Sequence, residues 1–260
     1  MKSPEKVTEY ITNWLSQYAK TSGMKGFVVG VSGGIDSAVT STLCARTGLP
    51  VLCLEMEIHQ AENQVNRAQK HIAWLEEHYP NVTHHSLSLT SIFESFQNTM
   101  PPTEASEQNF LSLANTRARL RMTTLYYFAA LYRYLVAGTG NKVEDFGVGF
   151  YTKYGDGGVD LSPIADLMKS EVFALGKHLD VIEEIQTAAP TDGLWGDDRT
   201  DEDQIGASYD QLEWAMRNSE ASETNLTEEQ KRTLQIYRKF NTQNKHKMEP
   251  IPVCEIPEGL

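Results

Sequence analysis

The feature that most constrains the fold is an alternation of two patterns along the first half of the chain. Short apolar runs rich in β-branched residues predict buried strands at 26–31, 51–55, 82–87 and 134–137. Apolar residues at helical spacing predict an opening amphipathic helix, a helix ending near 48, and helices at 61–78, 92–97 and 107–133. Strands that alternate with helices form right-handed βαβ crossovers. The sequence therefore predicts an α/β fold, a Rossmann-like three-layer αβα arrangement around a parallel sheet.

The length and the composition fit one globular domain. A chain of 260 residues with 40% hydrophobic residues can bury one large core, so residues 1–260 are predicted to form a single domain. Pro190–Gln204 is rich in acidic residues and is predicted to be a long mobile loop. No run approaches the ~18 apolar residues of a membrane span, and the N-terminus lacks the apolar core of a signal peptide. We therefore expect a cytoplasmic protein that binds no membrane.

The charge and the cysteines exclude some classes of function. A net charge of −12 argues against an extended nucleic-acid surface, which needs many Lys and Arg residues to neutralise phosphates. A single nucleotide pocket remains possible because it needs only a few local cations. The 3 cysteines, Cys44, Cys53 and Cys254, have no CxxC spacing, and the first two lie in apolar runs. We expect these two to be buried, reduced thiols.

The segment Gly30-Val31-Ser32-Gly33-Gly34-Ile35-Asp36-Ser37 joins the first predicted strand to a helix. Its two adjacent glycines allow a sharp turn that brings backbone N–H groups close to an anion, and the helix N-terminus adds further donors. A carboxylate at Asp36 would repel phosphates unless a cation lies between them, which predicts Mg²⁺. The alternative is a glycine turn capped by Asp36 and Ser37, without a ligand.

The strand–SGGxDS–helix arrangement lacks the GK[ST] ending of a Walker A loop. It resembles the pyrophosphate-binding loop of the ATP pyrophosphatase superfamily, whose members adenylate a substrate and have an adenine nucleotide alpha hydrolase-like fold. The stretches GTGNKVE (138–144) and GFYTKYGDGGVDLSPI (149–164) are similar to those of NAD synthetases. The resemblance extends to 115–122, Lys169, Pro190-Thr191 and His246-Lys247, and so covers nearly the whole chain.

The resemblance implies a ligase that uses ATP to convert deamido-NAD and ammonia into NAD, releasing AMP and pyrophosphate. Relatives that use glutamine carry a glutaminase domain before the synthetase part. Here the phosphate loop begins at residue 30, so we expect no such domain and free ammonia as the nitrogen donor. The family also implies a homodimer, Mg²⁺ as cofactor and ATP as co-substrate.

The resemblance implies a set of ATP-binding residues, which are Gly30, Val31, Ser32, Gly33, Gly34, Ile35, Asp36, Ser37, Met56, Thr139, Lys169 and Thr191. Asp36, Lys169 and Thr191 are expected to be catalytic, because a lysine and a hydroxyl can stabilise the charge that builds on a leaving pyrophosphate. Asp36 and Glu144 are expected to hold Mg²⁺, although Glu144 as an acid at a helix N-terminus is the alternative. Many relatives have an arginine-containing segment after the second strand, where this chain has Leu54–Ile58. Adenine is therefore expected to stack on Met56 or to bond its backbone.

The expected deamido-NAD contacts are Asn115, Arg119, Lys153, Asp156, Asp160, His246 and Lys247. Asn115 and Arg119 stand four apart and therefore share a helix face. Lys153, Asp156 and Asp160 frame a glycine-rich turn, and the resemblance puts Asp156 near the pyridine ring. The alternatives are a solvated charged helix face, a polar turn without a ligand and a basic C-terminal segment without a specific role.

The helix predicted at 107–133 carries two apolar stripes. Leu111, Ala114, Ala118, Leu125, Ala129 and Tyr132 form one stripe, and Phe110, Leu113, Leu120, Tyr127 and Leu131 form the other. One interpretation is a helix buried within its own domain. The other is that one stripe packs inside while the second meets another subunit.

Two rival functions remain at this point. One is a different ligase of the ATP pyrophosphatase superfamily, such as the ATP-binding subunit of a GMP synthetase or a tRNA-modifying enzyme. The acidic charge and the GFYTKYGDGG stretch argue against both. The other is a nucleotide-binding sensor that binds ATP and the dinucleotide without releasing pyrophosphate.

Overall fold

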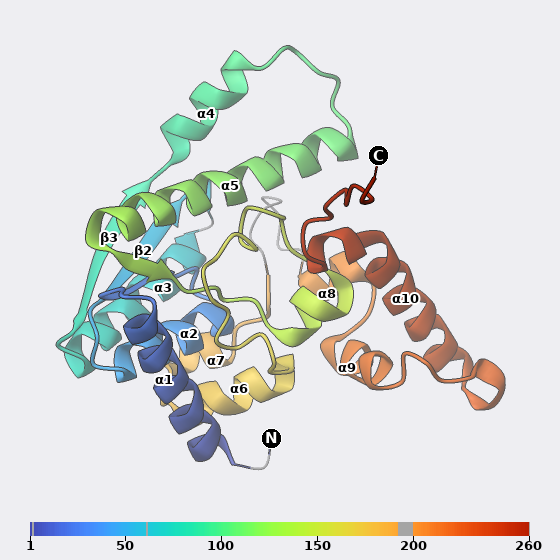
Figure 1. Cartoon of the computed structure of the whole chain (residues 1–260), viewed down its shortest axis with the longest axis horizontal. Helices are drawn as coiled ribbons and strands as arrows, with labels where there is room; N and C mark the ends of the chain where they lie inside the picture. The colour runs from blue at the N-terminus through green and yellow to red at the C-terminus, as the bar shows by residue number, and fades with distance from the viewer. Residues whose placement is uncertain (2, 61, 192–199, 260) are drawn as a thin grey trace.

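The fold is built on a parallel sheet, whose strands β2 and β3 are labelled at the left of Figure 1. A computed structural model of the chain describes residues 1, 3–60, 62–191 and 200–259. The four strands of the sheet run in the order β3-β2-β1-β4, with Phe27 paired to Val51 on one side and to Leu135 on the other. Their bounds are β1 Gly26–Gly30, β2 Val51–Glu57, β3 Val82–Ser88 and β4 Tyr134–Val136. Each lies within about two residues of its predicted range, so the predicted α/β class is confirmed.

The helices follow the predicted alternation and add a C-terminal group. Their bounds are α1 Pro4–Thr21, α2 Ile35–Arg46, α3 Glu62–His78, α4 Thr90–Thr99, α5 Glu107–Tyr132, α6 Lys169–His178, α7 Glu183–Gln186, α8 Asp201–Ile205, α9 Tyr209–Arg217 and α10 Glu228–Met248. A π-helix, η1, spans Val143–Val148, and a 3₁₀-helix, η2, spans Glu223–Asn225. Ser3 caps α1 and Ser106 caps α5 through their side chains, which explains where these two helices begin.

Alternating side chains of the strands face two separate helical layers. Phe27 and Val29 pack into one apolar cluster with α1, α2, α3 and α6, whereas Val28 packs into a second cluster with α4 and α5. Figure 1 shows these two helical layers on opposite sides of the sheet. Cys44 and Cys53 are buried in the first cluster as free thiols, as predicted.

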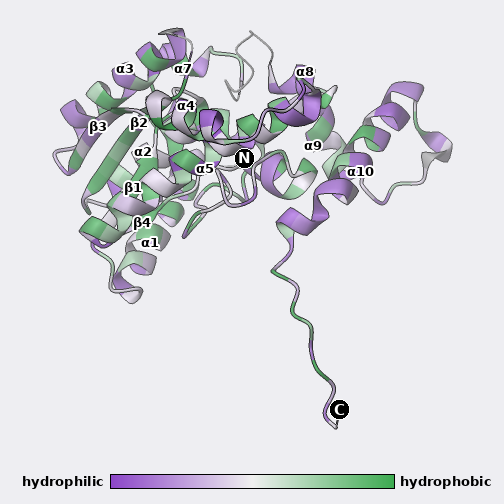
Figure 2. Cartoon of the chain, turned by 90° about the horizontal axis from the view of Figure 1, so that it is seen from above, coloured by the Kyte–Doolittle hydropathy of each residue, from purple (hydrophilic) through white to green (hydrophobic). Residues whose placement is uncertain are grey.

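A third apolar cluster holds η1, α9 and α10 together at one side of the sheet layers (Figure 1). Glu213 of α9 accepts hydrogen bonds from the backbone N–H and the hydroxyl of Ser170, at 2.8 and 2.9 Å, and so ties this cluster to the start of α6. Beyond α10, residues 249–259 are exposed and extend away from the body of the molecule, as Figure 2 shows. His246 and Lys247 near the end of α10 line the same cavity as Gly30 and Met56 at the ends of β1 and β2.

Two predictions need correction. Pro190–Gln204 is not a loop throughout, because α8 begins at Asp201 with a capping box from Thr200, while residues 192–199 lie outside the described part of the chain. The two stripes of α5 do not divide into an inner and an outer one. Leu113 and Leu120 of the second stripe pack against the second cluster, together with residues of the first stripe.

Several large apolar side chains of α5 are exposed. They are Phe110, Leu111, Tyr127, Leu131 and Tyr132. Leu111 and Tyr132 belong to the first stripe and the other three to the second, so each stripe has both buried and exposed members. Within the described ranges, no helix has the length and the apolar character needed to cross a membrane.

Candidate active site

One large cavity opens at the C-terminal ends of the strands, where ligands of open parallel sheets bind. Its volume is about 1010 Å³, and its lining joins the loop after β1 to the middle of α5, the 149–156 turn, the start of α6 and the end of α10. The predicted site residues that line it are Gly30, Val31, Ser32, Gly33, Gly34, Ile35, Asp36, Ser37, Met56, Asn115, Arg119, Thr139, Glu144, Lys153, Asp156, Lys169, Thr191, His246 and Lys247. The fold therefore brings together segments from both ends of the chain.

The loop between β1 and α2 is held by its own serines. The Ser37 hydroxyl donates to the carbonyl of Gly34 at 3.0 Å and accepts from the N–H of Ser32 at 3.2 Å. The Ser32 hydroxyl in turn accepts from the N–H of Gly34 at 3.3 Å. Gly33 has φ of +82°, a left-handed conformation that favours glycine. The loop is thus already folded around the first turn of α2, where N–H groups lack helical partners.

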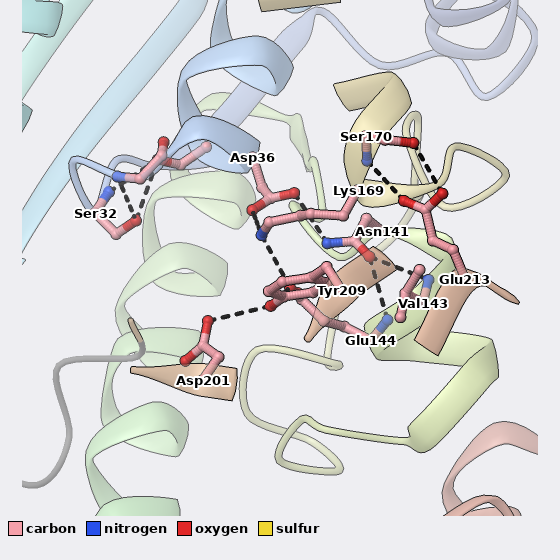
Figure 3. Close-up of polar contacts among 12 residues, drawn as sticks. Ser32, Asp36, Asn141, Val143, Glu144, Lys169, Ser170, Asp201, Tyr209 and Glu213 are labelled. Atoms are coloured by element: carbon pink, nitrogen blue, oxygen red, sulfur yellow. Dashed lines mark hydrogen bonds and ion pairs between the residues drawn. The ribbon is translucent and has the colours of Figure 1, made fainter. Parts of the chain in front are cut away.

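A buried ion cluster lies directly beside this loop (Figure 3). The Lys169 ammonium contacts Asp36 at 2.5 Å and Glu144 at 2.9 Å, and its side chain is almost fully buried. Lys169 is the first residue of α6, Asp36 lies in the first turn of α2, and Glu144 lies in the first turn of η1. Three elements far apart in sequence therefore place one cation between two carboxylates.

The charges of the cluster depend on one another. Burial alone would lower the pKa of Lys169, but Asp36 and Glu144 outweigh it and raise that pKa, so the ammonium stays charged. Burial raises the pKa of Glu144, but Lys169 and the hydrogen bond from Tyr209 bring it below its usual value. For Asp36 burial wins over Lys169, and its pKa is raised. One ammonium thus stabilises one of the two carboxylates more than the other.

Two neighbours orient the carboxylates. Tyr209 donates its one hydroxyl proton to Glu144 at 2.5 Å, and a carboxylate oxygen of Asp201 lies 3.2 Å from the same hydroxyl. The Lys169 ammonium lies 4.8 Å from the centre of the tyrosine ring. The Asn141 side-chain amide donates to Asp36 at 3.0 Å. Sequence reasoning missed Tyr209, Asp201 and Asn141 as site residues. Asn141 was within the quoted GTGNK stretch, but Tyr209 and Asp201 carried no local signal, because their role depends on where α8 and α9 pack.

The glycine-rich turn forms a second wall of the cavity. The Thr152 hydroxyl donates to Asn115 of α5 at 2.7 Å, and Arg119 donates to the Lys153 carbonyl at 3.3 Å. Within the turn, the Thr152 N–H donates to Asp156 at 2.9 Å. Burial raises the pKa of Asp156 despite these hydrogen bonds. Asn115 and Arg119 therefore fix the turn onto α5, while Asp156 holds the turn itself together.

The end of α10 closes over the same turn. Lys153 donates to the His246 carbonyl at 2.6 Å, and Lys247 donates to the carbonyls of Gly149 and Tyr151, both at 2.9 Å. A Cβ at Gly149 would lie 2.4 Å from the side chain of Asn244, so this close packing requires glycine. Lys247 thus reaches the turn through its side chain, whereas His246 contacts it through its backbone carbonyl.

Asp160 lies apart from the other predicted substrate residues and does not line the cavity. Its carboxylate accepts from the Tyr126 hydroxyl at 3.0 Å and from the N–H of Val136 at 2.8 Å. These bonds tie the chain after the turn to β4 and α5, so in this structure Asp160 supports the fold around the turn. A contact between Asp160 and the substrate stays a prediction.

The predicted adenine side of the cavity is held by an arginine that the sequence did not single out. Arg121 of α5 donates to the Met56 carbonyl at 3.0 Å and to the Gln60 side chain at 2.8 Å. It therefore fixes the chain that leaves β2, next to the loop after β1.

The residues at the cluster fit a Mg²⁺ ion that is shared with a nucleotide. Mg²⁺ is usually bound through one or two carboxylates, with phosphate oxygens and waters completing its shell. Asp36 and Glu144 are two such carboxylates, within reach of a single ammonium. Within the described residues there is no group of three or more His, Cys, Asp or Glu that could hold a metal by itself. The donor set therefore suits an ion brought together with ATP.

Comparison with known proteins decides the family. The sequence model of the NAD synthase family matches residues 7–251 of the chain. The chain belongs to the NAD synthase family. The NH(3)-dependent NAD(+) synthetase of Methanosarcina acetivorans is 34% identical, and the alignment covers 98% of each chain. That of Carboxydothermus hydrogenoformans is 36% identical over 84% of this chain and 87% of the relative.

Solved structures of this family share the fold. The NMN synthetase of Francisella tularensis superposes with a TM-score of 0.84 at 32% identity, over 99% of this chain and 100% of that chain. The NH3-dependent NAD synthetase of Campylobacter jejuni gives 0.77 at 28% identity, over 97% and 100%. The family predicted from the GTGNKVE and GFYTKYGDGG stretches is therefore confirmed.

Proposed function

We propose that this NAD synthase family member is a cytoplasmic ligase that uses ATP and ammonia to convert deamido-NAD into NAD. The observation that carries the proposal is the Asp36–Lys169–Glu144 cluster, which joins the phosphate-binding loop to the cavity of the 149–156 turn. A triphosphate on the loop and a carboxylate held by the turn would meet at this cluster. The names of the relatives support ammonia as the donor.

The first half-reaction activates the carboxylate. One of its oxygens attacks the α-phosphorus of ATP, the bond from that phosphorus to the bridging oxygen breaks, and pyrophosphate leaves with the electron pair. The product is an acyl-adenylate. Lys169 supplies a buried positive charge beside the loop, and Thr139 and Thr191 line the same cavity as hydroxyl donors.

The second half-reaction forms the amide. Ammonia attacks the acyl carbon, the bond from that carbon to the AMP oxygen breaks, and the nitrogen loses a proton. Asp156 is a buried carboxylate of raised pKa within the turn, and it is suited to accept that proton. The turn and the end of α10 limit the access of water, which would otherwise hydrolyse the acyl-adenylate.

Mg²⁺ would be held by Asp36 and Glu144 together with ATP. When bound, it would supply positive charge that neutralises the phosphate oxygens. Asn141 and Tyr209 orient the two carboxylates for this purpose through their side-chain hydrogen bonds.

The active form is proposed to be a homodimer. The exposed apolar side chains of α5, among them Phe110, Tyr127 and Leu131, form a surface that one protomer leaves uncovered. Leu111 and Arg119 of the same helix line the cavity, so a partner on this helix would lie next to the substrate region. A second copy of the chain is the occupant we propose.

A second candidate substrate is favoured by one comparison. The Francisella tularensis structure with a TM-score of 0.84 is named for the synthesis of NMN. The corresponding acid is nicotinic acid mononucleotide, which carries the same carboxylate as deamido-NAD but lacks the adenylate half. The same chemistry at Asp36, Lys169 and Glu144 would serve both acids.

The test is a direct competition between the two acids. The protein is incubated with ATP, Mg²⁺, ammonia and either deamido-NAD or nicotinic acid mononucleotide, and kcat/KM for the amide product is measured for each. A higher value for deamido-NAD supports the proposal, and a higher value for the mononucleotide supports the second candidate. AMP without an amide product from either acid would contradict both.

A further inference from the structure

Helix α3 packs against the phosphate-binding loop more closely than a side chain at Gly33 would allow. A Cβ at Gly33 would lie 2.7 Å from the carbonyl oxygen of Gln64 and 3.0 Å from the backbone nitrogen of Ala68. Gly33 allows this close approach because it has a left-handed φ and no side chain. Arg67 precedes Ala68 on α3, and its Cβ would lie 3.2 Å from a Cβ at Gly33, so this residue stands directly beside the loop.

Arg67 reaches the loop through one of its nitrogens. Its Nε donates to the carbonyl of Gly33 at 3.3 Å, and the half-buried side chain lines the large cavity. A guanidinium has five N–H donors in a rigid planar fork. The bond to Gly33 uses one of them, and among the described residues no acceptor binds the two terminal nitrogens. The bond to Gly33 therefore orients the guanidinium, and its two terminal nitrogens remain available to bind phosphate oxygens.

The charges around the cavity make this position notable. Among the described residues that line it, Arg67 and Lys169 are the two cations bonded to the 32–37 loop. Lys169 is already shared between Asp36 and Glu144. Lys153 and Lys247 bind carbonyls on the far wall. A triphosphate on the loop brings more negative charge than Lys169 and one Mg²⁺ can match, because both of these cations are also shared with Asp36 and Glu144.

We propose that the Arg67 guanidinium binds the β- and γ-phosphates of ATP and holds them as they leave as pyrophosphate. The inference rests on the proposed function, because it assumes cleavage between the α- and β-phosphates. Negative charge grows on the leaving pyrophosphate as the phosphorus–oxygen bond breaks, and a guanidinium can pair with two phosphate oxygens at once. AMP has neither of these phosphates, so Arg67 does not contact it.

The test compares the binding of pyrophosphate and AMP to the full-length protein by calorimetry, in the presence of Mg²⁺. Arg67→Gln is expected to weaken pyrophosphate about tenfold to a hundredfold, the range for a charged hydrogen-bonding pair, and to change AMP less than about twofold. Arg67→Lys keeps a positive charge, so its affinity for pyrophosphate is expected to lie between those of the unaltered protein and Arg67→Gln. Lys70→Gln is the matched control, since Lys70 lies on the same helix and pairs with Glu184 at the surface.

Three results would overturn the proposal. Unchanged pyrophosphate affinity in Arg67→Gln is the first. An equal loss for pyrophosphate and AMP is the second, because it would mean that Arg67 only holds the loop through Gly33. Failure of the unaltered protein to bind pyrophosphate is the third. None of these measurements needs turnover, so a protein that forms no amide would contradict the proposed function separately.

Discussion

The hydroxyl of Tyr209 donates a 2.5 Å hydrogen bond to Glu144, while the ring of the same tyrosine lies against the ammonium of Lys169. One side chain from α9 therefore contacts two members of the buried ion cluster. A carboxylate oxygen of Asp201, the first residue of α8, lies 3.2 Å from the same hydroxyl. Tyr209 therefore connects α8 and α9 to the ion cluster beside the phosphate-binding loop.

Tyr209→Phe should remove this bond and keep the ring. We expect kcat to fall about tenfold or more, because the buried Glu144 carboxylate loses the hydrogen bond that orients it. The melting temperature should change little, since the phenyl ring still fills the third cluster. Tyr237→Phe, another buried tyrosine of that cluster, is the control and should keep its activity. Equal activities of the two variants would contradict a positioning role for Tyr209.

Asp36→Ala should nearly abolish turnover while the fold stays intact. The substitution removes one of the two carboxylates that hold Lys169 and would hold Mg²⁺. Losing one preorganised electrostatic contact of this kind often costs about 10²–10³ in rate. The release of AMP gives the rate, and circular dichroism checks the fold. A folded variant with more than about half of the activity would refute the assignment of Asp36.

Lys153→Ala should weaken the use of the nicotinate substrate far more than the binding of ATP. Lys153 is bonded to α10 and α5, whereas the lysine bonded to Asp36 of the 32–37 loop is Lys169. We expect KM for the acid to rise and KM for ATP to stay nearly constant. Lys142→Ala, which removes a surface pair with Asp166, is the control. Equal changes in both KM values would argue against this division of the cavity.

Tyr127→Asp should produce monomers with poor use of the dinucleotide. Tyr127 is 63% exposed on the outer face of α5, so a carboxylate there disturbs a proposed interface without entering the core. Tyr10→Asp is the matched control, because Tyr10 is 73% exposed on α1, in the helical layer on the other side of the sheet. Light scattering distinguishes one chain from two. A fully active monomer of the unaltered protein would exclude the dimer.

His71 should make the fold sensitive to mild acid. It is buried between α2 and α3, where burial lowers its pKa to about 4 from 6.5. As the pH falls, the His71 imidazole becomes protonated in the unfolded chain before it does in the folded one. Its contribution to the free energy of unfolding is therefore fully present above pH 6.5 and is lost as the pH drops toward 4. The difference amounts to about 3 kcal/mol in the free energy of unfolding.

The measurement is urea unfolding at pH 7 and at pH 4.5, compared between variants. His71→Leu should lose less stability on acidification than the unaltered protein, whatever its stability at pH 7. His84→Gln, at an exposed position paired with Glu76, should keep the full loss. The same loss in His71→Leu as in the unaltered protein would show that other groups cause the acid sensitivity.

Local chemistry made much of this protein predictable. The strands could be located because β-branched apolar runs suit a sheet that is covered on both faces. The loop after β1 could be interpreted as an anion site because its serines and glycines act within a few residues of one another. The quoted stretches around Glu144 and Lys153 indicated the family for the same reason, since each is a short, contiguous pattern.

Tertiary packing decided the contacts between residues that are far apart in the sequence. Tyr209 and Glu144 are 65 residues apart, and their contact exists only because α9 packs against η1 and α6. Arg67 becomes part of the phosphate site through the close approach of α3 to Gly33. Asp160, adjacent in sequence to the turn, is drawn to β4 instead of the cavity. Sequence alone determines the local elements because their hydrogen bonds are local, whereas the partners of a buried charge depend on which distant elements the core brings together.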